Sequence, residues 1–361
     1  MTRLTVLNVA YPFAPVAPET AGGAEHVLGM LDEALVDAGH RSLVLAAKGS
    51  QVAGELIAAE VPERLDLTTR RRTQSAYKDL LLSILRTRRI DVVHFHGLDY
   101  AEYFPGGHGT YLATIHLPPG WYPLQSFELP VHLVCVSRDQ KKASVLKGGE
   151  LIPNGVRVDH LYPEGRRGDY VVAMGRICPE KAFHLALDAA TVCVRRLLLA
   201  GQVFPYPEHQ KYFEDEIRPR LGGGHGFVGS VSGAGKRALL ARAHCLVIPS
   251  RARETSSLVA MEALACGTPV VGIRIGALPE IIEHGRTGWL VDHPGELAEA
   301  IEAAVQIRPE VCRTAAEERF SAQRMTGAYL RLYEKLAGIS EARDPDSNEW
   351  QPGVSEPRAA A

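Results

Sequence analysis

The segment RARETSSLVAMEALACGTPVV, residues 251–271, carries the clearest pattern in this chain. The short apolar run CLVIPS precedes it at residues 245–250 and predicts a buried strand. Strong helix formers then fill Leu258–Ala265. Gly267 ends this helix, and the apolar Val270–Ile273 is the next strand. The segment therefore predicts a strand–helix–strand unit of an α/β protein.

Two carboxylates lie eight residues apart in this segment, Glu254 on the loop after the strand and Glu262 more than a turn inside the helix. Ser256 or Ser257 stands at the N-cap position. The unpaired N–H groups at the helix start, with the positive end of the helix dipole behind them, form an anion site. This arrangement suits a sugar nucleotide, which offers a phosphate to the helix and hydroxyls to the carboxylates. The alternative for Glu262 is an ordinary solvated helix residue.

Length and composition are those of a soluble globular protein with two cores. The chain has 361 residues, 46% of them hydrophobic, and a formal net charge of -2, which leaves no nucleic-acid footprint. No apolar run approaches the ~20 residues that span a bilayer, and the N-terminus reads as a strand rather than a signal peptide. The six cysteines form no CxxC pair, so we expect reduced, buried thiols and a cytoplasmic location, with disulfides as the alternative.

Strand and helix patterns alternate through both halves of the chain. Residues 4–47 read as strand, helix and strand, a βαβ unit whose strands should be parallel. A second series begins with YVVAMGR at residues 170–176, followed by a helix from about Glu180. The polar segment HLYPEGRRGD, residues 160–169, joins the two series. We therefore expect two α/β domains with a ligand between their strand ends.

Two motifs of this chain resemble a known family. The Glu-x7-Glu spacing with its EALACGTPVVG ending, and GRICPEK at residues 175–181, are similar to segments of the family 4 retaining glycosyltransferases of GT-B fold. The resemblance spans most of the chain and implies two Rossmann-like domains whose parallel sheets face a central cleft. It also implies that Arg176 and Lys181 bind the donor diphosphate and stabilise charge on the leaving group. Surface charges without a ligand are the alternative for these two cations.

The resemblance also implies domain boundaries. The N-terminal Rossmann-like domain, on the acceptor side, takes residues 1–160, and the C-terminal domain, on the donor side, takes residues 161–320. An amphipathic pattern fills residues 321–339 and resembles the family's final helix, which crosses back onto the first domain. Packing on the second domain alone is the alternative. Residues 340–361 are polar and rich in proline, and we expect them to be disordered.

Further residues receive roles from the family resemblance. Glu254 faces the donor sugar without acting as a covalent nucleophile, Glu262 binds the ribose, and His116 faces the donor sugar with its backbone near the reacting carbon. The other donor-side residues lie in a glycine-rich loop, in FVGSV and around the helix start: Gly22, Gly23, Phe227, Val228, Thr255, Ser256, Ser257, Leu258 and Val259. As an isolated signal, the two glycines more often mark a flexible turn. His96 and Asn154 belong to the acceptor side or the cleft rim, with structural roles as the alternative.

No metal site is expected. His94 and His96 alternate at a strand end, a spacing that could chelate a metal, but no third ligand is evident, and core imidazoles are the alternative. GAGKRA at residues 233–238 imitates a dinucleotide fingerprint but follows no strand directly, and DPD at residues 344–346 lies in the expected tail. We therefore expect a metal-independent transferase without a cofactor. Its co-substrate is a nucleoside diphosphate sugar, with a UDP-sugar as the first expectation.

Departures from the family text leave the substrates open. Where the family commonly has Gly and Phe after the first Glu, this chain has hydroxyl residues beginning with Thr255, which could bind a sugar or a phosphate, and Ala182 replaces the usual Gly after Lys181. The acceptor is a hydroxyl of a sugar, a lipid-linked sugar or a small natural product. The basic segment 68–89 could touch an anionic membrane, with a solvated helix face as the alternative. A GT-B epimerase or phosphorylase and a non-catalytic sugar-nucleotide sensor are the alternative functions.

Overall fold

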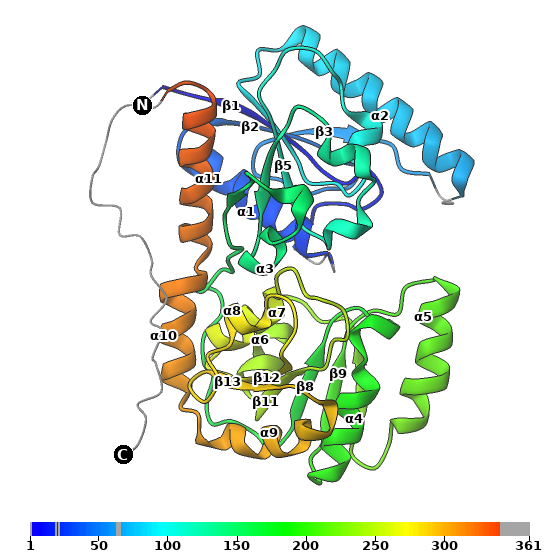
Figure 1. Cartoon of the computed structure of the whole chain (residues 1–361), viewed down its shortest axis with the longest axis vertical. Coiled ribbons are helices and arrows are strands. Elements are labelled where there is room, and N and C mark those ends of the chain that lie inside the picture. Colours follow the sequence, from blue (N-terminus) through cyan, green and yellow to red (C-terminus); the bar gives the residue numbers. More distant parts are fainter. Residues whose placement is uncertain (1, 19, 21, 63–65, 340–361) are drawn as a thin grey trace.

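The computed structural model describes residues 2–18, 20, 22–62 and 66–339. These residues form two lobes, one above the other in Figure 1, and each lobe is built on a parallel β-sheet. The expected tail at residues 340–361, with its DPD sequence, lies outside the described residues. The prediction of an α/β protein with two parallel sheets is confirmed.

Within the described residues, the first sheet has seven strands and the second has six. In both sheets, the next two strands of the sequence lie on one side of the lobe's first strand, and the later strands lie on its other side. This reversal of strand order marks the carboxyl ends of the central strands as the place where ligands bind in open α/β sheets. In spatial order the first sheet is β3 (Glu55–Ala59), β2 (Arg41–Ala47), β1 (Thr5–Val9), β4 (Val92–Phe95), β5 (Tyr111–Ile115), β6 (His132–Cys135) and β7 (Glu150–Leu151). The second sheet is β10 (Gly226–Gly229), β9 (Leu197–Ala200), β8 (Val171–Met174), β11 (Cys245–Ile248), β12 (Val270–Ile273) and β13 (Gly288–Val291).

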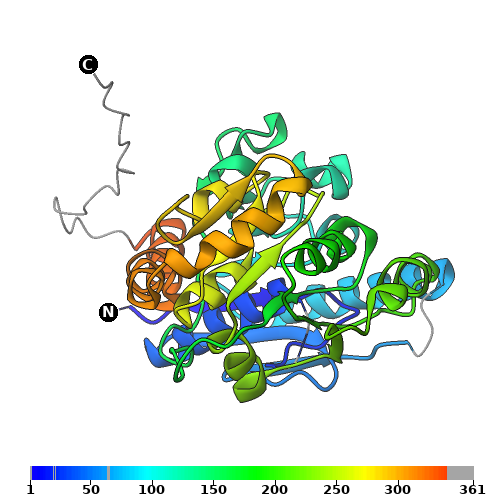
Figure 2. The ribbon, with the colours of Figure 1, turned by 90° about the horizontal axis from the view of Figure 1, so that it is seen from below.

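Each sheet is covered by helices on both faces. In β1, Leu7 packs on one face beside α2 (Leu67–Thr87), while Val6 packs on the other beside α1 (Gly23–Asp37). Alternate side chains of a doubly covered strand enter opposite cores, which is why these strands read as nearly continuous apolar runs. In the second lobe α4 (Phe183–Val192) and α9 (Leu297–Ala303) share one core, and they lie side by side in Figure 2. The opposite core contains α6 (Gly233–Ala241), α7 (Leu258–Ala265) and α10 (Pro309–Phe320).

The last helix connects the two lobes. Ser321 separates α10 on the second lobe from α11 (Ala322–Leu336), and it pairs with Val156 in an isolated parallel bridge. From there α11 runs along the first lobe (Figure 1), where Met325 and Tyr329 are buried with residues of α1. The amphipathic pattern of this helix thus covers the first core. Among the described residues, no helix combines the length and the apolarity needed to cross a bilayer.

The segment after β8 differs from the sequence expectation. Residues Pro179–Lys181 form a 3-10 turn, and α4 begins only at Phe183 instead of about Glu180. Ala182 between them has a left-handed backbone with φ of 50°, which interrupts the helix. The strand β3 was also not expected, because it is a short edge strand next to a polar loop.

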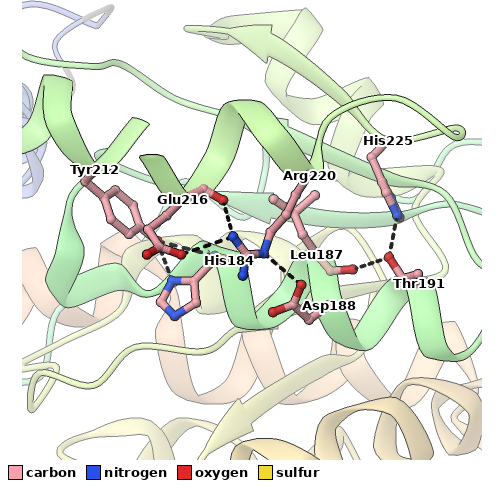
Figure 3. A network of polar contacts seen from close by, with 8 residues as sticks. All are labelled: His184, Leu187, Asp188, Thr191, Tyr212, Glu216, Arg220 and His225. Carbon is pink, nitrogen blue, oxygen red and sulfur yellow. Dashed lines mark hydrogen bonds and ion pairs between the residues drawn. The ribbon is translucent and has the colours of Figure 1, made fainter. Parts of the chain in front are cut away.

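The polar segment after β9 is ordered by a hydrogen-bond network (Figure 3). It contains α5 (Pro207–Tyr212) and a wider π-helical turn. The Tyr212 hydroxyl lies 3.0 Å from His184 Nδ1. Arg220 pairs with Asp188 at 2.8 Å and with the Glu216 carboxylate at 3.0 Å. These contacts fix α5 against α4, although the segment has little apolar periodicity of its own.

Candidate active site

The loops at the carboxyl ends of the strands meet between the lobes. The Thr255 hydroxyl, after β11, donates to the backbone carbonyl of His116, after β5, at 2.7 Å. Glu280 in α8 (Leu278–Ile281) accepts from the backbone N–H of Arg138 at 2.9 Å and of Asp139 at 2.7 Å, both at the start of α3 (Arg138–Lys141). Loops from the two sheets therefore lie on either side of one site. The Thr255 hydroxyl already has a hydrogen-bond partner in the protein.

The loop carboxylate Glu254 is paired with Lys181, the lysine of the GRICPEK motif. Its Oε1 accepts from Lys181 Nζ and from Ser250 Oγ, both at 2.5 Å. Burial alone would raise the pKa of Glu254, but the charge and hydrogen bond of Lys181, the Ser250 hydroxyl and the charge of Arg176 outweigh it and lower that pKa. Glu254 is therefore an anion at neutral pH, held beside two cations. Ser250 was not singled out from the sequence.

The helix carboxylate Glu262 forms a second, separate pair. Its Oε1 lies 2.5 Å from Lys236 Nζ, and the Glu262 side chain is only 10% exposed. The reading of Glu262 as a solvated helix residue is therefore wrong. Lys236 comes from the GAGKRA sequence, at the start of α6, which follows β10 with Phe227 and Val228. The motif thus contributes a cation to the site although it is no dinucleotide fingerprint.

The N-terminus of α7 faces the glycine-rich loop of the first lobe. A Cβ placed on Gly23 would lie 3.3 Å from Leu258 Cδ1, and one on Gly22 would lie 1.8 Å from Glu25 Oε2. A side chain at Gly22 would therefore displace the Glu25 carboxylate, and one at Gly23 would press tightly on Leu258 at the helix tip. Ser257 is the N-cap residue as expected, but its side chain makes no capping hydrogen bond.

Glu25 is a buried carboxyl near Arg176. Burial raises its pKa, and the charge of Arg176 opposes this rise. Ser256, close to the α7 tip, has a buried hydroxyl without a hydrogen-bond partner among the described residues. It lines a cavity of about 180 Å³ between the lobes, together with Arg138 and Glu280.

Three histidines form a buried cluster beneath this site, and we call His94, His96 and His116 the histidine cluster. His94 bonds to the Tyr333 hydroxyl at 2.7 Å and to the Thr114 hydroxyl at 2.8 Å. Burial lowers the pKa of His116 to about 3 and holds the pKa values of the other two well below their usual range. Neutral imidazoles with protein partners agree with the reading of His94 and His96 as core residues.

The hydrogen bonds within the cluster determine which ring nitrogen of His116 carries the proton. His96 Nε2 lies 3.3 Å from Asn8 Oδ1, and His96 Nδ1 lies 3.1 Å from His116 Nε2. Because both rings are neutral, an accepting Asn8 oxygen places the proton of each imidazole on Nε2. The His116 Nδ1 is then an acceptor, and it is buried without a partner among the described residues. His96, expected at the cleft rim, lies behind His116 and is 3% exposed.

The remaining sequence candidates lie around this centre. Asn154 is buried near the crossover to α11, and its Oδ1 lacks a hydrogen-bond partner among the described residues. Phe227 packs against Phe213 with ring centroids 5.0 Å apart, whereas Val228 is exposed. All six cysteines are free thiols.

Comparison with known families identifies the protein class. A model described as Glycosyltransferase Family 4 matches residues 21–160, and one described as Glycosyl transferases group 1 matches residues 168–306. The chain belongs to the family 4 glycosyltransferases. This confirms the resemblance carried by the Glu-x7-Glu and GRICPEK motifs.

Individual relatives of this glycosyltransferase match the chain over only part of their own length. The chain is 30% identical to phosphatidyl-myo-inositol mannosyltransferase of Mycobacterium leprae over 210 residues, which are 52% of this chain and 53% of that protein. The chain spans 26% and 53% of the length of the first two curated relatives.

Two solved structures show that the fold is the GT-B fold. AviGT4, a glycosyltransferase involved in avilamycin A biosynthesis, has a TM-score of 0.70 at 24% identity, over 93% of this chain and 99% of that one. HepE of Anabaena in complex with UDP-glucose has a TM-score of 0.71 at 18% identity, over 92% of this chain and 100% of that one.

Proposed function

We propose that the protein is a retaining, metal-independent glycosyltransferase that moves a sugar from a nucleoside diphosphate to a hydroxyl acceptor. The observation that carries the proposal is the pairing of Glu254 with Lys181 beside Arg176, at the loop where the two lobes meet. A diphosphate can replace the carboxylate as the partner of Lys181. The two cations then stabilise the negative charge that develops on the leaving group.

The two carboxylates divide the donor between them in this proposal. Glu254, released from Lys181 by the diphosphate, orients the sugar hydroxyls and balances positive charge at the ring. Glu262, inside α7, binds the ribose hydroxyls next to Lys236. The bare Nδ1 of His116 accepts a hydrogen bond from a sugar hydroxyl, since the protein supplies no donor for it among the described residues.

Retention follows if the acceptor hydroxyl approaches from the side of the leaving group. The departing phosphate then takes the acceptor proton as the new glycosidic bond forms, and Glu254 stays free of a covalent bond. No residue of the site needs to act as a nucleophile, and no metal is required for the transfer.

A UDP-sugar is the proposed donor, because the similar HepE structure holds UDP-glucose. The proposed acceptor is a sugar, a lipid-linked sugar or a small natural product with a free hydroxyl. The mannosyltransferase relative is named for phosphatidyl-myo-inositol, which is consistent with a polyol hydroxyl as acceptor.

A ligand panel and a product analysis test the proposal. UDP-, GDP-, ADP- and TDP-sugars are first compared by their effect on thermal unfolding, where a donor at 100 times its Kd stabilises by about 2.7 kcal/mol. The stabilising donor is then incubated with candidate acceptors, and NMR reads the anomeric configuration of the product against that of the donor. A retained anomer supports the proposal. Donor binding without any transfer indicates a sensor, epimerisation without acceptor indicates an epimerase, and an inverted anomer contradicts retention.

A further inference from the structure

Three side chains with metal-binding groups converge at the loop that carries Arg176 and Lys181. They are Cys178, Glu180 and His209, and their ligand atoms all lie within 4.8 Å of one another. We propose that these three residues, the Cys–Glu–His cluster, bind a zinc-type divalent cation. This site is distinct from the proposed transfer chemistry, which needs no metal.

The sheet topology brings the three residues together. Cys178 and Glu180 follow β8, and His209 lies in α5, which follows the neighbouring parallel strand β9. The two connecting segments run closely side by side, because the N–H of Ile177 donates to the carbonyl of Gln202 at 3.0 Å. The carboxyl ends of adjacent parallel strands thus bring His209 close to Cys178 and Glu180, which are 31 and 29 positions earlier in the chain.

The network of Figure 3 holds the histidine side of the cluster in place. Tyr212 lies one helical turn after His209, and its hydroxyl bonds to His184 of α4 at 3.0 Å. The helix α4 in turn begins just after the turn that contains Glu180. Both halves of the cluster are therefore attached to α4, so a cation would find its ligands already near their bound positions.

An unpaired buried nitrogen is the second observation that points to a ligand. His209 Nδ1 is buried and has no hydrogen-bond partner among the described residues. The rings of Tyr206 and Phe204 pack edge-to-face against this imidazole, with ring centroids 5.1 and 6.3 Å away. Buried polar atoms are almost always hydrogen-bonded in native proteins, so the nitrogen lacks a partner that a cation would supply.

The chemistry of the three groups matches zinc. Thiolate, imidazole and carboxylate are its usual protein ligands, at about 2.0–2.3 Å from the ion. At tetrahedral angles these bonds place the ligand atoms about 3.3–3.6 Å apart, so movements of roughly 1 Å would complete the site. A thiolate and a carboxylate together neutralise the charge of a divalent ion, and three protein ligands leave one position open to water.

The cluster also has an ordinary alternative role. The Cys178 thiol donates to the backbone carbonyl of Arg176 at 3.5 Å, which would stabilise the turn without any metal. Binding measurements separate the two roles, because a purely structural thiol binds no cation. The metal-binding measurements do not depend on the transferase activity. A negative result in the donor panel therefore bears only on the proposed function, and a negative metal titration bears only on the Cys–Glu–His cluster.

The test is a metal titration of the full chain after removal of adventitious metal. Zn²⁺ binding is measured by competition with a chromophoric chelator, and Co²⁺ is used to detect thiolate-to-metal charge transfer by absorption. We expect one site per chain, and a loss of Zn²⁺ affinity of at least about 100-fold in Cys178→Ser and His209→Gln, beyond the 10–100-fold typical of an outer-shell change. The control is Cys193→Ser, which replaces a half-buried thiol at the C-terminal end of α4. This variant should bind Zn²⁺ as tightly as the unmodified chain does.

Two outcomes would overturn the proposal. One is the absence of a charge-transfer band together with no stoichiometric Zn²⁺ binding. The other is equal affinity in the unmodified chain and in the folded His209→Gln variant, which would place any bound metal elsewhere. His209 is not in a core, so this variant stays informative even if Cys178→Ser folds poorly.

Discussion

The histidine cluster predicts a steep loss of stability below pH 7. His94, His96 and His116 are buried with lowered pKa values, that of His116 to about 3. The unfolded chain protonates these imidazoles near pH 6.5, whereas the folded chain does so only at much lower pH. Between these values the unfolded state binds more protons, so the stabilisation is present above the unfolded-state pKa and is lost progressively as the pH falls through about 6.5.

The size of this effect follows from proton linkage. One imidazole that titrates only in the unfolded state contributes about 1.2–1.3 kcal/mol between pH 7 and pH 5.5, so three contribute about 4 kcal/mol. Domains are commonly stable by only 5–15 kcal/mol, so this loss is easily measured. Urea unfolding at pH 7.0, 6.3 and 5.5 is the assay, with native structure checked by circular dichroism at each pH.

A single variant isolates one member of the cluster. Gln at position 94 can bond to the Tyr333 and Thr114 hydroxyls, so His94→Gln should fold while removing about one third of the cluster's pH dependence. The exposed His132 provides the matched control, and His132→Gln should leave the pH dependence unchanged. If His94→Gln folds natively and loses stability with pH as steeply as the unmodified chain, the buried neutral state of His94 is refuted.

Four further substitutions test two residues of the site and the backbone at Ala182. Lys181→Ala should lower turnover by roughly 10²-fold or more in a donor-consumption assay, since one preorganised charge is lost; unchanged turnover and unchanged UDP affinity would exclude the diphosphate role. Glu262→Ala should weaken UDP and UDP-sugar alike by about 1.5–3 kcal/mol in calorimetry, and an effect confined to the UDP-sugar would exclude the ribose role. Ala182→Gly should leave the unfolding free energy within about 1 kcal/mol, because relief of the left-handed backbone offsets the lost methyl group. The equally buried Ala186→Gly inside α4 should cost about 2 kcal/mol, and equal losses in the two variants would contradict the strain at Ala182.

Local signals allowed the α7 unit to be predicted with its bounds. The run of helix formers, the N-cap position and Gly267 are all within one short segment, and Gly267 does adopt a positive φ of 77°. The adjacent strand Val270–Ile273 was equally clear, because it is apolar and follows the helix stop directly. Where the helix start signal, the helix stop signal and the apolar periodicity agree within one segment, the element can be predicted without knowledge of its tertiary contacts.

The side-chain contacts that complete the site could not be predicted from local sequence signals. Lys236 pairs with Glu262 across 26 positions, and nothing near either residue indicates the partner. Ser250 is a strand-end residue whose role depends on where the Glu254 carboxylate points. The left-handed Ala182 occupies a position where a glycine is expected, so the backbone conformation survives the substitution at an energetic cost. Pairings of this kind are set by the packing of separate βα units.

The balance between turnover and nucleotide affinity in Glu254→Gln tests the central claim most directly. The amide keeps the size of the side chain and can still accept from Lys181 and Ser250, while the negative charge that faces the sugar is removed. Interactions made mainly in the transition state affect turnover more than ground-state binding. We therefore expect Glu254→Gln to lose most of its turnover, by roughly 10²-fold, with UDP affinity nearly intact by calorimetry. Full turnover, or a loss of UDP affinity as large as the loss of turnover, would contradict the assignment of Glu254 to the sugar.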